Sequence, residues 1–165
     1  MNKELIERAK SIRLLLMDCD GVLTDGRLYF GENGETFKTF DVRDGQGIVS
    51  WHRAGFFSGI ISGRNSRIVE RRANELGIRF IKQSSTDKLE DFREISAEGG
   101  FTAEETAYIG DDIPDIQLLK VVGLSFAVAD AAEEVCSNAD IILGKKGGNG
   151  AVREMIDFLM SSKSI

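Results

Sequence analysis

Short apolar runs alternate with helix-forming stretches along most of the chain, and this alternation limits its possible folds more than any other feature. The runs cover residues 12–17, 56–61, 78–81, 106–109, 124–128 and 139–143, and none of them alternates apolar with polar residues. The helical stretches cover residues 2–10, 44–54, 65–76, 86–98, 113–121, 131–136 and 149–160. Strands without alternation are typical of parallel sheets that are covered on both faces. The pattern predicts an α/β fold with a doubly wound parallel sheet.

One segment breaks this alternation directly after the first strand. Residues 28–30 and 36–40 flank a glycine-containing turn and predict a β-hairpin. The hairpin carries the large apolar residues Leu28, Phe30, Phe37 and Phe40. A two-stranded hairpin is only marginally stable alone, so this apolar surface is expected to pack against other copies of the chain.

Length and charge exclude several classes of protein. A chain of 165 residues predicts a single domain over residues 1–165. The net charge of -6, with no concentrated basic patch, argues against nucleic acid as a partner. Two cysteines, Cys19 and Cys136, are too few for a disulfide framework and lack the paired spacing of a zinc site. No apolar stretch is long enough to cross a membrane and no signal peptide is apparent, so we expect a cytoplasmic protein without membrane partners.

Polar and acidic side chains gather directly after the predicted strands. The residues at these positions are Asp18, Asp20, Ser62, Lys88, Asp111, Asp112 and Asp115. In a doubly wound sheet, ligands bind beyond the carboxyl ends of the strands. We therefore expect these side chains to meet at one edge of the sheet and to form the functional site.

Such a group of carboxylates repels itself unless a divalent cation neutralises it, and oxygen ligands with a phosphate partner are typical of Mg²⁺. The cluster therefore predicts Mg²⁺ as cofactor together with a phosphorylated substrate. Asp18 can attack phosphorus as a nucleophile, while Asp20 serves the leaving oxygen first as an acid and then as a base. Ser62 and Lys88 are expected to hold the phosphoryl oxygens.

A simpler interpretation exists for each residue alone, because Asp is favoured at helix caps and in turns. For Asp115, a cap and a supporting role behind the metal ligands stay equally open. Joint placement at successive strand ends is much harder to obtain from capping alone. His52, the one histidine, lies away from the strand ends, so we assign it a structural role.

The same residues resemble, in order, the four motifs of the haloacid dehalogenase superfamily phosphatases. These are residues 18–25 (DCDGVLTD), residues 62–64 (SGR), Lys88 and residues 110–115 (GDDIPD). More narrowly, residues 40–45 (FDVRDG), Arg72 and residues 147–154 (GGNGAVRE) resemble the phosphatases of 3-deoxy-D-manno-octulosonate 8-phosphate, which act in lipopolysaccharide precursor synthesis. Val49 and residues 83–85 depart from the pattern of these relatives.

The resemblance implies that Asp18 is the nucleophile and Asp20 the acid and base. It also implies that Asp18, the Asp20 carbonyl group and Asp111 bind Mg²⁺, with Asp112 and Asp115 behind them. The substrate contacts that it implies are Asp20, Asp41, Val42, Arg43, Asp44, Gly45, Arg64, Arg72 and Lys88. The spacing of Arg64 and Arg72 predicts that both lie on one side of the helix at 65–76, where a guanidinium suits a sugar carboxylate.

Three alternatives have their own signatures. A response-regulator receiver also combines an acidic pocket, a hydroxyl and a lysine, but its phosphorylated Asp lies on a middle strand, where this chain has Ser62. An oligomerisation domain of the same fold need not keep every motif, whereas this chain does. Within the enzymes, a phosphatase for a nine-carbon sugar acid stays the alternative. Arg64 favours the eight-carbon substrate, because the nine-carbon relatives resemble a Ser/Thr-Gly-Glu pattern there.

The segments between the motifs leave no room for a cap domain. The hairpin, a helix and a strand fill residues 25–62, and one helix and one strand fill residues 62–88. A site that forms a phosphoryl-enzyme benefits from closure, so we expect walls from a neighbouring subunit. Together with the resemblance to capless family members, this predicts a homotetramer whose hairpins associate.

Overall fold

The computed structural model describes residues 3–164, and its centre is a parallel sheet. Six strands form this sheet in the order β5-β4-β1-β6-β7-β8. Their bounds are β1 Leu14–Met17, β4 Phe57–Ile61, β5 Phe80–Lys82, β6 Thr106–Gly110, β7 Leu124–Ala127 and β8 Ile141–Ile142. Every pairing between neighbours is parallel. The α/β doubly wound fold predicted from the unalternating runs is therefore confirmed.

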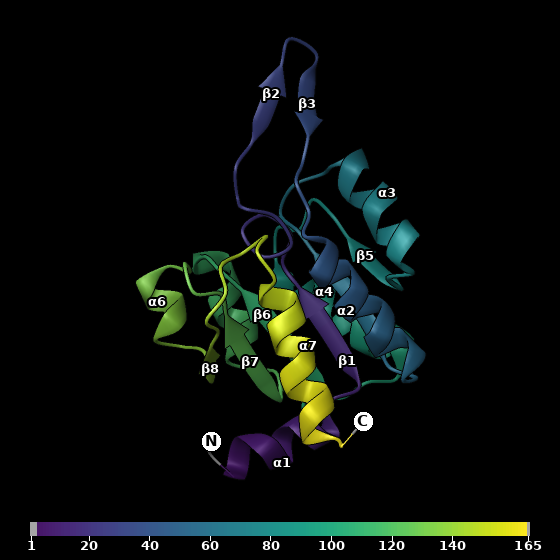
Figure 1. Ribbon diagram of the computed structural model, residues 1–165, viewed down its shortest axis with the longest axis vertical. Helices are drawn as coiled ribbons and strands as arrows, with labels where there is room; N and C mark the ends of the chain where they lie inside the picture. Colours follow the sequence, from purple (N-terminus) through teal and green to yellow (C-terminus); the bar gives the residue numbers. More distant parts are fainter. Residues whose placement is uncertain (1–2, 165) are drawn as a thin grey trace.

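Helices cover both faces of the sheet (Figure 1). Their bounds are α1 Lys3–Ser11, α2 Val42–Arg53, α3 Arg67–Leu76, α4 Lys88–Gly99, the 3-10 turn η1 Ile113–Asp115, α5 Ile116–Leu119, α6 Glu133–Cys136 and α7 Ala151–Ser162. Residues of α1, α2, α3 and α7 enter one buried apolar cluster. Residues of α4, α5 and α6 enter the other.

The central strand explains why the runs do not alternate. Leu15 and Met17 of β1 belong to the first apolar cluster, whereas Leu14 and Leu16 belong to the second. Successive side chains point to opposite faces, and both faces are buried, so every position of β1 is apolar.

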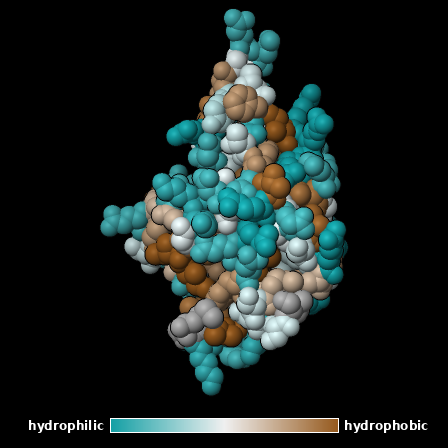
Figure 2. Space-filling model, viewed as in Figure 1, coloured by the Kyte–Doolittle hydropathy of each residue, from teal (hydrophilic) through white to brown (hydrophobic). Residues whose placement is uncertain are grey.

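The predicted hairpin is present and projects from the carboxyl ends of the sheet strands (Figure 1). It consists of β2 Tyr29–Gly31 and β3 Gly34–Phe37, which pair antiparallel. Apolar residues lie on it below a hydrophilic tip (Figure 2). Leu28, Phe30 and Phe37 are 47%, 60% and 50% exposed. Phe40, predicted to be the fourth apolar residue of the hairpin, lies beyond the end of β3 and packs against the first apolar cluster of the core.

Two helical stretches differ from the prediction in ways that side-chain contacts explain. Helix α3 begins at Arg67 rather than at residue 65, because the Ser66 side chain accepts a hydrogen bond from the Val69 amide and caps the helix. The stretch at 113–121 splits into η1 and α5 at Asp115, whose side chain is engaged elsewhere. The predicted helix start at Asn2 lies outside the described residues.

Candidate active site

The carboxyl ends of β1 and β6 and the start of α4 bring four charged side chains together. The ammonium group of Lys88, at the first turn of α4, lies 2.8 Å from Asp18 Oδ1 and 2.5 Å from Asp115 Oδ1. One oxygen each from Asp18, Asp111 and Asp115 lies within 4.8 Å of the others. The strand-end cluster predicted from the sequence is therefore formed by the fold.

Asp115 supports this cluster from behind. Its Oδ1 accepts hydrogen bonds from Lys88 Nζ and from the Tyr108 hydroxyl group at 2.6 Å. Its Oδ2 accepts from the amides of Asp111 and Asp112, at 2.9 and 3.2 Å. Since both oxygens are engaged, Asp115 fixes the loop after β6 and the position of Lys88 rather than offering a free ligand atom. Asp112 also caps η1, through a bond to the Ile113 amide.

Asp111 has a free ligand atom. Its Oδ1 is buried and has no hydrogen-bond partner within the described residues. The approach of Asp111 depends on Gly21, whose φ is +93° and whose hypothetical Cβ would lie 2.0 Å from Asp111 Oδ2. Any side chain at position 21 would therefore displace the carboxylate.

The electrostatics of the two carboxylates call for a cation. Burial raises the pKa of Asp18 above its usual range, and Lys88 offsets this only in part. Burial, together with the charges of Asp18 and Asp115, raises the pKa of Asp111 to about 8. Burial acts to lower the pKa of Lys88, but Asp18 and Asp115 outweigh it and keep the lysine charged. One ammonium group thus faces three carboxylates, and the unpartnered Oδ1 of Asp111 fits a divalent cation such as Mg²⁺.

These residues open into a cavity of about 640 Å³. Asp18, Asp20, Lys88 and Asp111 line it, as do Ser62 and Arg64 from the end of β4. The Ser62 hydroxyl oxygen accepts a hydrogen bond from the Arg64 amide at 3.3 Å, which sets the turn after the strand. Every residue expected to act on the phosphoryl group therefore faces one cavity.

Two residues of the hairpin segment were missed by the sequence prediction. The Lys38 ammonium group donates a hydrogen bond to Asp20 Oδ1 and lies 3.0 Å from Glu35 Oε1. The Lys38 side chain is only 1% exposed. Lysines of hairpins are usually solvated, so no sequence pattern indicated this burial.

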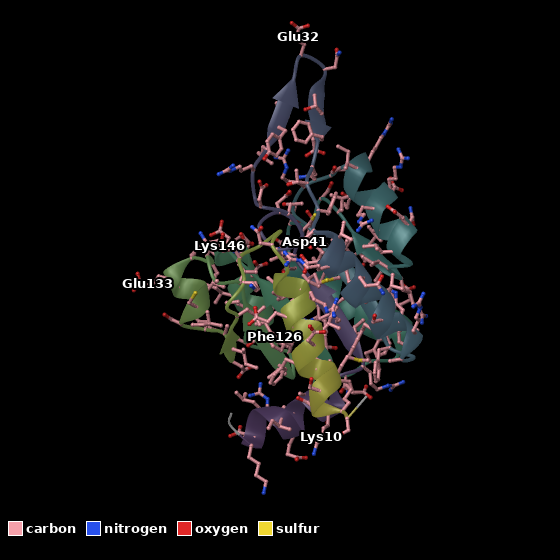
Figure 3. The ribbon with its side chains drawn as sticks, viewed as in Figure 1. Lys10, Glu32, Asp41, Phe126, Glu133 and Lys146 are labelled. Carbon is pink, nitrogen blue, oxygen red and sulfur yellow. The ribbon has the colours of Figure 1, made fainter. Side chains whose placement is uncertain are left out.

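Residues 41–45 and Arg72 lie outside this cavity. Asp41 caps α2 through the Arg43 amide and pairs with the Arg43 side chain at 2.7 Å. Figure 3 shows Asp41 at the end of the sheet below the hairpin. Asp44 is buried and accepts hydrogen bonds from the amides of Gly150 and Arg153 at the start of α7. Val42 is exposed.

Arg72 packs beside this second group of residues. Its guanidinium lies 5.9 Å from the Phe40 ring centroid and pairs with Glu75 at 3.1 Å. A Cβ at Gly45 would lie 2.4 Å from Arg72 Nη2, so the glycine makes room for the guanidinium. Arg64 precedes α3 and lines the cavity, whereas Arg72 does not. The expectation that both arginines share one helical face is therefore wrong, because Ser66 starts the helix after Arg64.

Comparison with known proteins gives a consistent result. The haloacid dehalogenase-like hydrolase family model matches residues 56–156. The 3-deoxy-D-manno-octulosonate 8-phosphate phosphatase KdsC of Yersinia pestis is 44% identical over 157 residues, which are 95% of this chain and 84% of that protein. KdsC of Escherichia coli K12 is 42% identical over 160 residues, 97% of this chain and 85% of that protein.

A solved structure agrees with these sequences. The 3-deoxy-D-manno-octulosonate 8-phosphate phosphatase of Moraxella catarrhalis, crystallised with a magnesium ion, a phosphate ion and KDO, superimposes with a TM-score of 0.96. It is 37% identical, and the match covers 99% of this chain and 94% of that chain. A chain that shares both the fold and so much of the sequence of these enzymes belongs with them to the haloacid dehalogenase-like hydrolase family.

Proposed function

We propose that this chain is a Mg²⁺-dependent phosphatase that hydrolyses 3-deoxy-D-manno-octulosonate 8-phosphate to the sugar acid and phosphate. The observation that carries the proposal is the contact of Asp18 with Lys88 beside Asp111 at one wall of the cavity. The similarity to KdsC enzymes over nearly the whole chain supports the choice of substrate.

The reaction takes two steps on the residues of the cavity. In the first, Asp18 attacks phosphorus, the bond from phosphorus to the sugar oxygen breaks, and Asp20 gives a proton to that oxygen. In the second, Asp20 takes a proton from a water molecule that attacks the aspartyl phosphate, and phosphate is released. Lys88 and Ser62 bind the phosphoryl oxygens throughout and balance their charge.

Asp18, Asp111 and the carbonyl group of Asp20 are the ligands that we assign to Mg²⁺. When bound, the cation neutralises the carboxylates and the phosphoryl oxygens, so that an anionic nucleophile can approach an anionic substrate. Asp115 keeps Lys88 and the loop of Asp111 in place for this arrangement, through the four hydrogen bonds described above.

Replacement of the nucleophile tests the mechanism. Asp18→Asn is expected to abolish turnover, because a neutral amide cannot form the aspartyl phosphate. Asp20→Asn is expected to slow release of the sugar by about 100-fold or more, because the leaving oxygen loses its proton donor. Phosphate release from purified protein measures both, and EDTA should stop the wild type until Mg²⁺ is restored. Circular dichroism checks that the variants fold. Wild-type turnover in Asp18→Asn would contradict the mechanism.

The assembly belongs to the same proposal. Residues 1–165 form a single hydrolase domain without a cap, and four chains associate through the hairpins. The exposed side chains of Leu28, Phe30 and Phe37 support this, because apolar residues of that size are normally covered. A neighbouring chain then closes the side of the cavity that the hairpin does not.

A further inference from the structure

Lys38 is the most deeply buried ammonium group among the side chains paired with a carboxylate in residues 3–164. Its side chain is 1% exposed, whereas that of Asp20, its partner, is 18% exposed and lines the cavity. A substrate in the cavity can therefore reach Asp20 but not Lys38. Lys38 can act on the reaction only through the carboxyl group that it holds.

The two oxygens of Asp20 have different surroundings. Oδ1 accepts the hydrogen bond from Lys38 Nζ. Oδ2 accepts no hydrogen bond within the described part of the chain and lies 3.7 Å from Nε of Arg64, which also lines the cavity. Lys38 thus fixes the rotation of the carboxyl group and leaves Oδ2 as the oxygen available for proton transfer.

Lys38 is itself held by Glu35, which also belongs to the hairpin segment. Glu35 Oε1 lies 3.0 Å from Lys38 Nζ, and Glu35 Oε2 accepts a hydrogen bond from the Ser66 hydroxyl group. Ser66 caps α3, and its amide donates to Gln83 Oε1 at 2.7 Å. The chain of contacts from Asp20 therefore ends on the body of the fold, at the start of α3 and the loop after β5.

The charges agree with this geometry. The Lys38 ammonium group lies between the carboxylates of Asp20 and Glu35, and its side chain is only 1% exposed. Burial acts to raise the pKa of Glu35, and the bonds from Ser66 and Lys38 overcome it. The side chains of Lys38 and Glu35 are largely shielded from solvent, at 1% and 15% exposed, so their contact fixes the position of the ammonium group.

We propose that Lys38, held by Glu35, is a positioning residue that presents Oδ2 of Asp20 to the leaving oxygen of the substrate. The inference rests on the proposed phosphatase function, since Asp20 is its acid. It also gives the hairpin a role in the chemistry: β3 ends at Phe37, so a shift of β3 moves Lys38 and turns the acid.

Leaving groups of different basicity separate this role from a structural one. An alcohol needs a proton as its bond to phosphorus breaks, whereas p-nitrophenolate leaves with little help, so a misplaced acid harms alkyl phosphates selectively. We would measure kcat/KM, which reports the phosphoryl-transfer step, for three substrates: 3-deoxy-D-manno-octulosonate 8-phosphate, glycerol 2-phosphate and p-nitrophenyl phosphate.

Lys38→Met is expected to lower kcat/KM about 10- to 100-fold for both alkyl phosphates and less than about 3-fold for p-nitrophenyl phosphate. Glu35→Gln keeps the shape of the side chain, and its loss of kcat/KM should fall on the same alkyl phosphates but be smaller. Lys38→Arg, which keeps the charge and a donor, should recover part of the loss. Lys120→Met on the exposed end of α5 is the matched control and should change none of the three values.

Several results would overturn the proposal. Equal losses on all three substrates in Lys38→Met, or no loss on any of them, would show that Lys38 does not act through the acid. If Lys38→Met does not fold, Glu35→Gln decides by the same comparison. In an Asp20→Asn background, Lys38→Met should cause no further selective loss, and an additive loss would contradict the coupling. Activity of the wild type, compared with that of Asp20→Asn, tests the phosphatase function separately from the role of Lys38. Light scattering on each variant shows whether assembly has changed.

Discussion

At the scale of single residues, the carboxylates of the site differ in how many of their oxygens have hydrogen-bond partners. Asp111 keeps one buried oxygen without a partner and Asp18 pairs with Lys88 through Oδ1, whereas both oxygens of Asp115 are occupied by hydrogen bonds. Asp20 accepts a hydrogen bond on one oxygen only, from Lys38. The number of partners on each carboxylate therefore separates the reacting groups from the supporting ones.

Arg64 should recognise the carboxylate of the substrate. Arg64→Ala is expected to raise KM for 3-deoxy-D-manno-octulosonate 8-phosphate roughly 10- to 100-fold, since a charged hydrogen bond is worth about 1.5 to 3 kcal/mol. Hydrolysis of glycerol 2-phosphate, which has an alcohol leaving group and no carboxylate, should hardly change. Arg71→Ala, at an exposed position of α3, is the control. An equal loss of activity on glycerol 2-phosphate would instead show that Arg64 acts through its ion pair with Asp20.

Asp44 should make stability depend on pH in a direction opposite to that of most carboxylates. Burial raises the pKa of Asp44 to about 6 from an ordinary value of 3.8, so the folded state keeps the proton longer than the unfolded state. Stability therefore falls as pH rises from about 4 to about 6, by on the order of 2 to 3 kcal/mol.

Urea unfolding of wild type and Asp44→Asn measures this effect, because the variant lacks the titration. The free energy of unfolding of wild type relative to the variant should be larger at pH 4 than at pH 7. The reverse result would mean that the Gly150 and Arg153 amides at the start of α7 favour the ionised form more strongly than burial opposes it.

At the scale of elements, the loop from β5 to α4 holds one conformation that its sequence does not favour. Ser84 has φ of 59°, a left-handed conformation that costs a residue with a side chain about 1 kcal/mol. Glycine adopts this conformation freely. The loop passes beside the cavity, where its neighbour Ser85 is one of the lining residues.

Ser84→Gly is expected to raise the free energy of unfolding by about 0.5 to 1 kcal/mol, through relief of this strain. Chemical denaturation measures the change. Ser161→Gly in α7 is the control of opposite sign, since glycine destabilises a helix. A lower stability in Ser84→Gly would show that the serine side chain makes a contact that outweighs the strain.

The sheet could be predicted from the sequence, whereas the contact that holds the carboxyl group of Asp20 could not. Leu14 and Leu16 face one apolar cluster, and Leu15 and Met17 face the other. Because β1 is buried on both faces, its sequence is an unbroken apolar run that can be recognised without the structure. Lys38 pairs with Asp20 across the chain, and nothing local distinguishes it from a solvated lysine. Likewise, the break between Arg64 and α3 depends on Gln83, which binds the Ser66 amide from another segment.

At the scale of the whole molecule, the hairpin segment gathers three of the large apolar side chains that the described chain leaves exposed, Leu28, Phe30 and Phe37. Tyr29 and Phe37 stack on it at 4.2 Å between ring centroids, and Arg64 lies 5.7 Å from the Phe30 ring. About half of the surface of each of Leu28, Phe30 and Phe37 still faces solvent, at 47%, 60% and 50%, and Figure 2 shows apolar residues on the visible side of the hairpin. Among residues 3–164 there is no helix with the length and apolar character needed to cross a bilayer. Contacts between copies are the cover that we propose for this surface.

Light scattering tests the proposed tetramer. Wild type at micromolar concentration should have a mass near four chains of 18.2 kDa each. Phe30→Glu or Phe37→Glu should dissociate it, because each places charge in the apolar contact, and selectivity for the sugar acid phosphate should fall with the mass. Glu32→Gln at the hydrophilic tip of the hairpin is the control (Figure 3). A wild-type mass near one chain, with full activity, would contradict the assembly.

The ends of the described chain lie near each other at the end of the molecule opposite the hairpin (Figure 1). Helices α1 and α7 pack against each other there, and Lys163 Nζ donates a hydrogen bond to the Lys10 carbonyl group at 2.5 Å. Figure 3 shows Lys10 at this end, far from Asp41 and from Glu32 at the tip. A flexible tether attached at either end would therefore fix the enzyme to a solid support with the cavity and the hairpin turned toward the solution. The hairpins of the immobilised chains would stay free to contact one another.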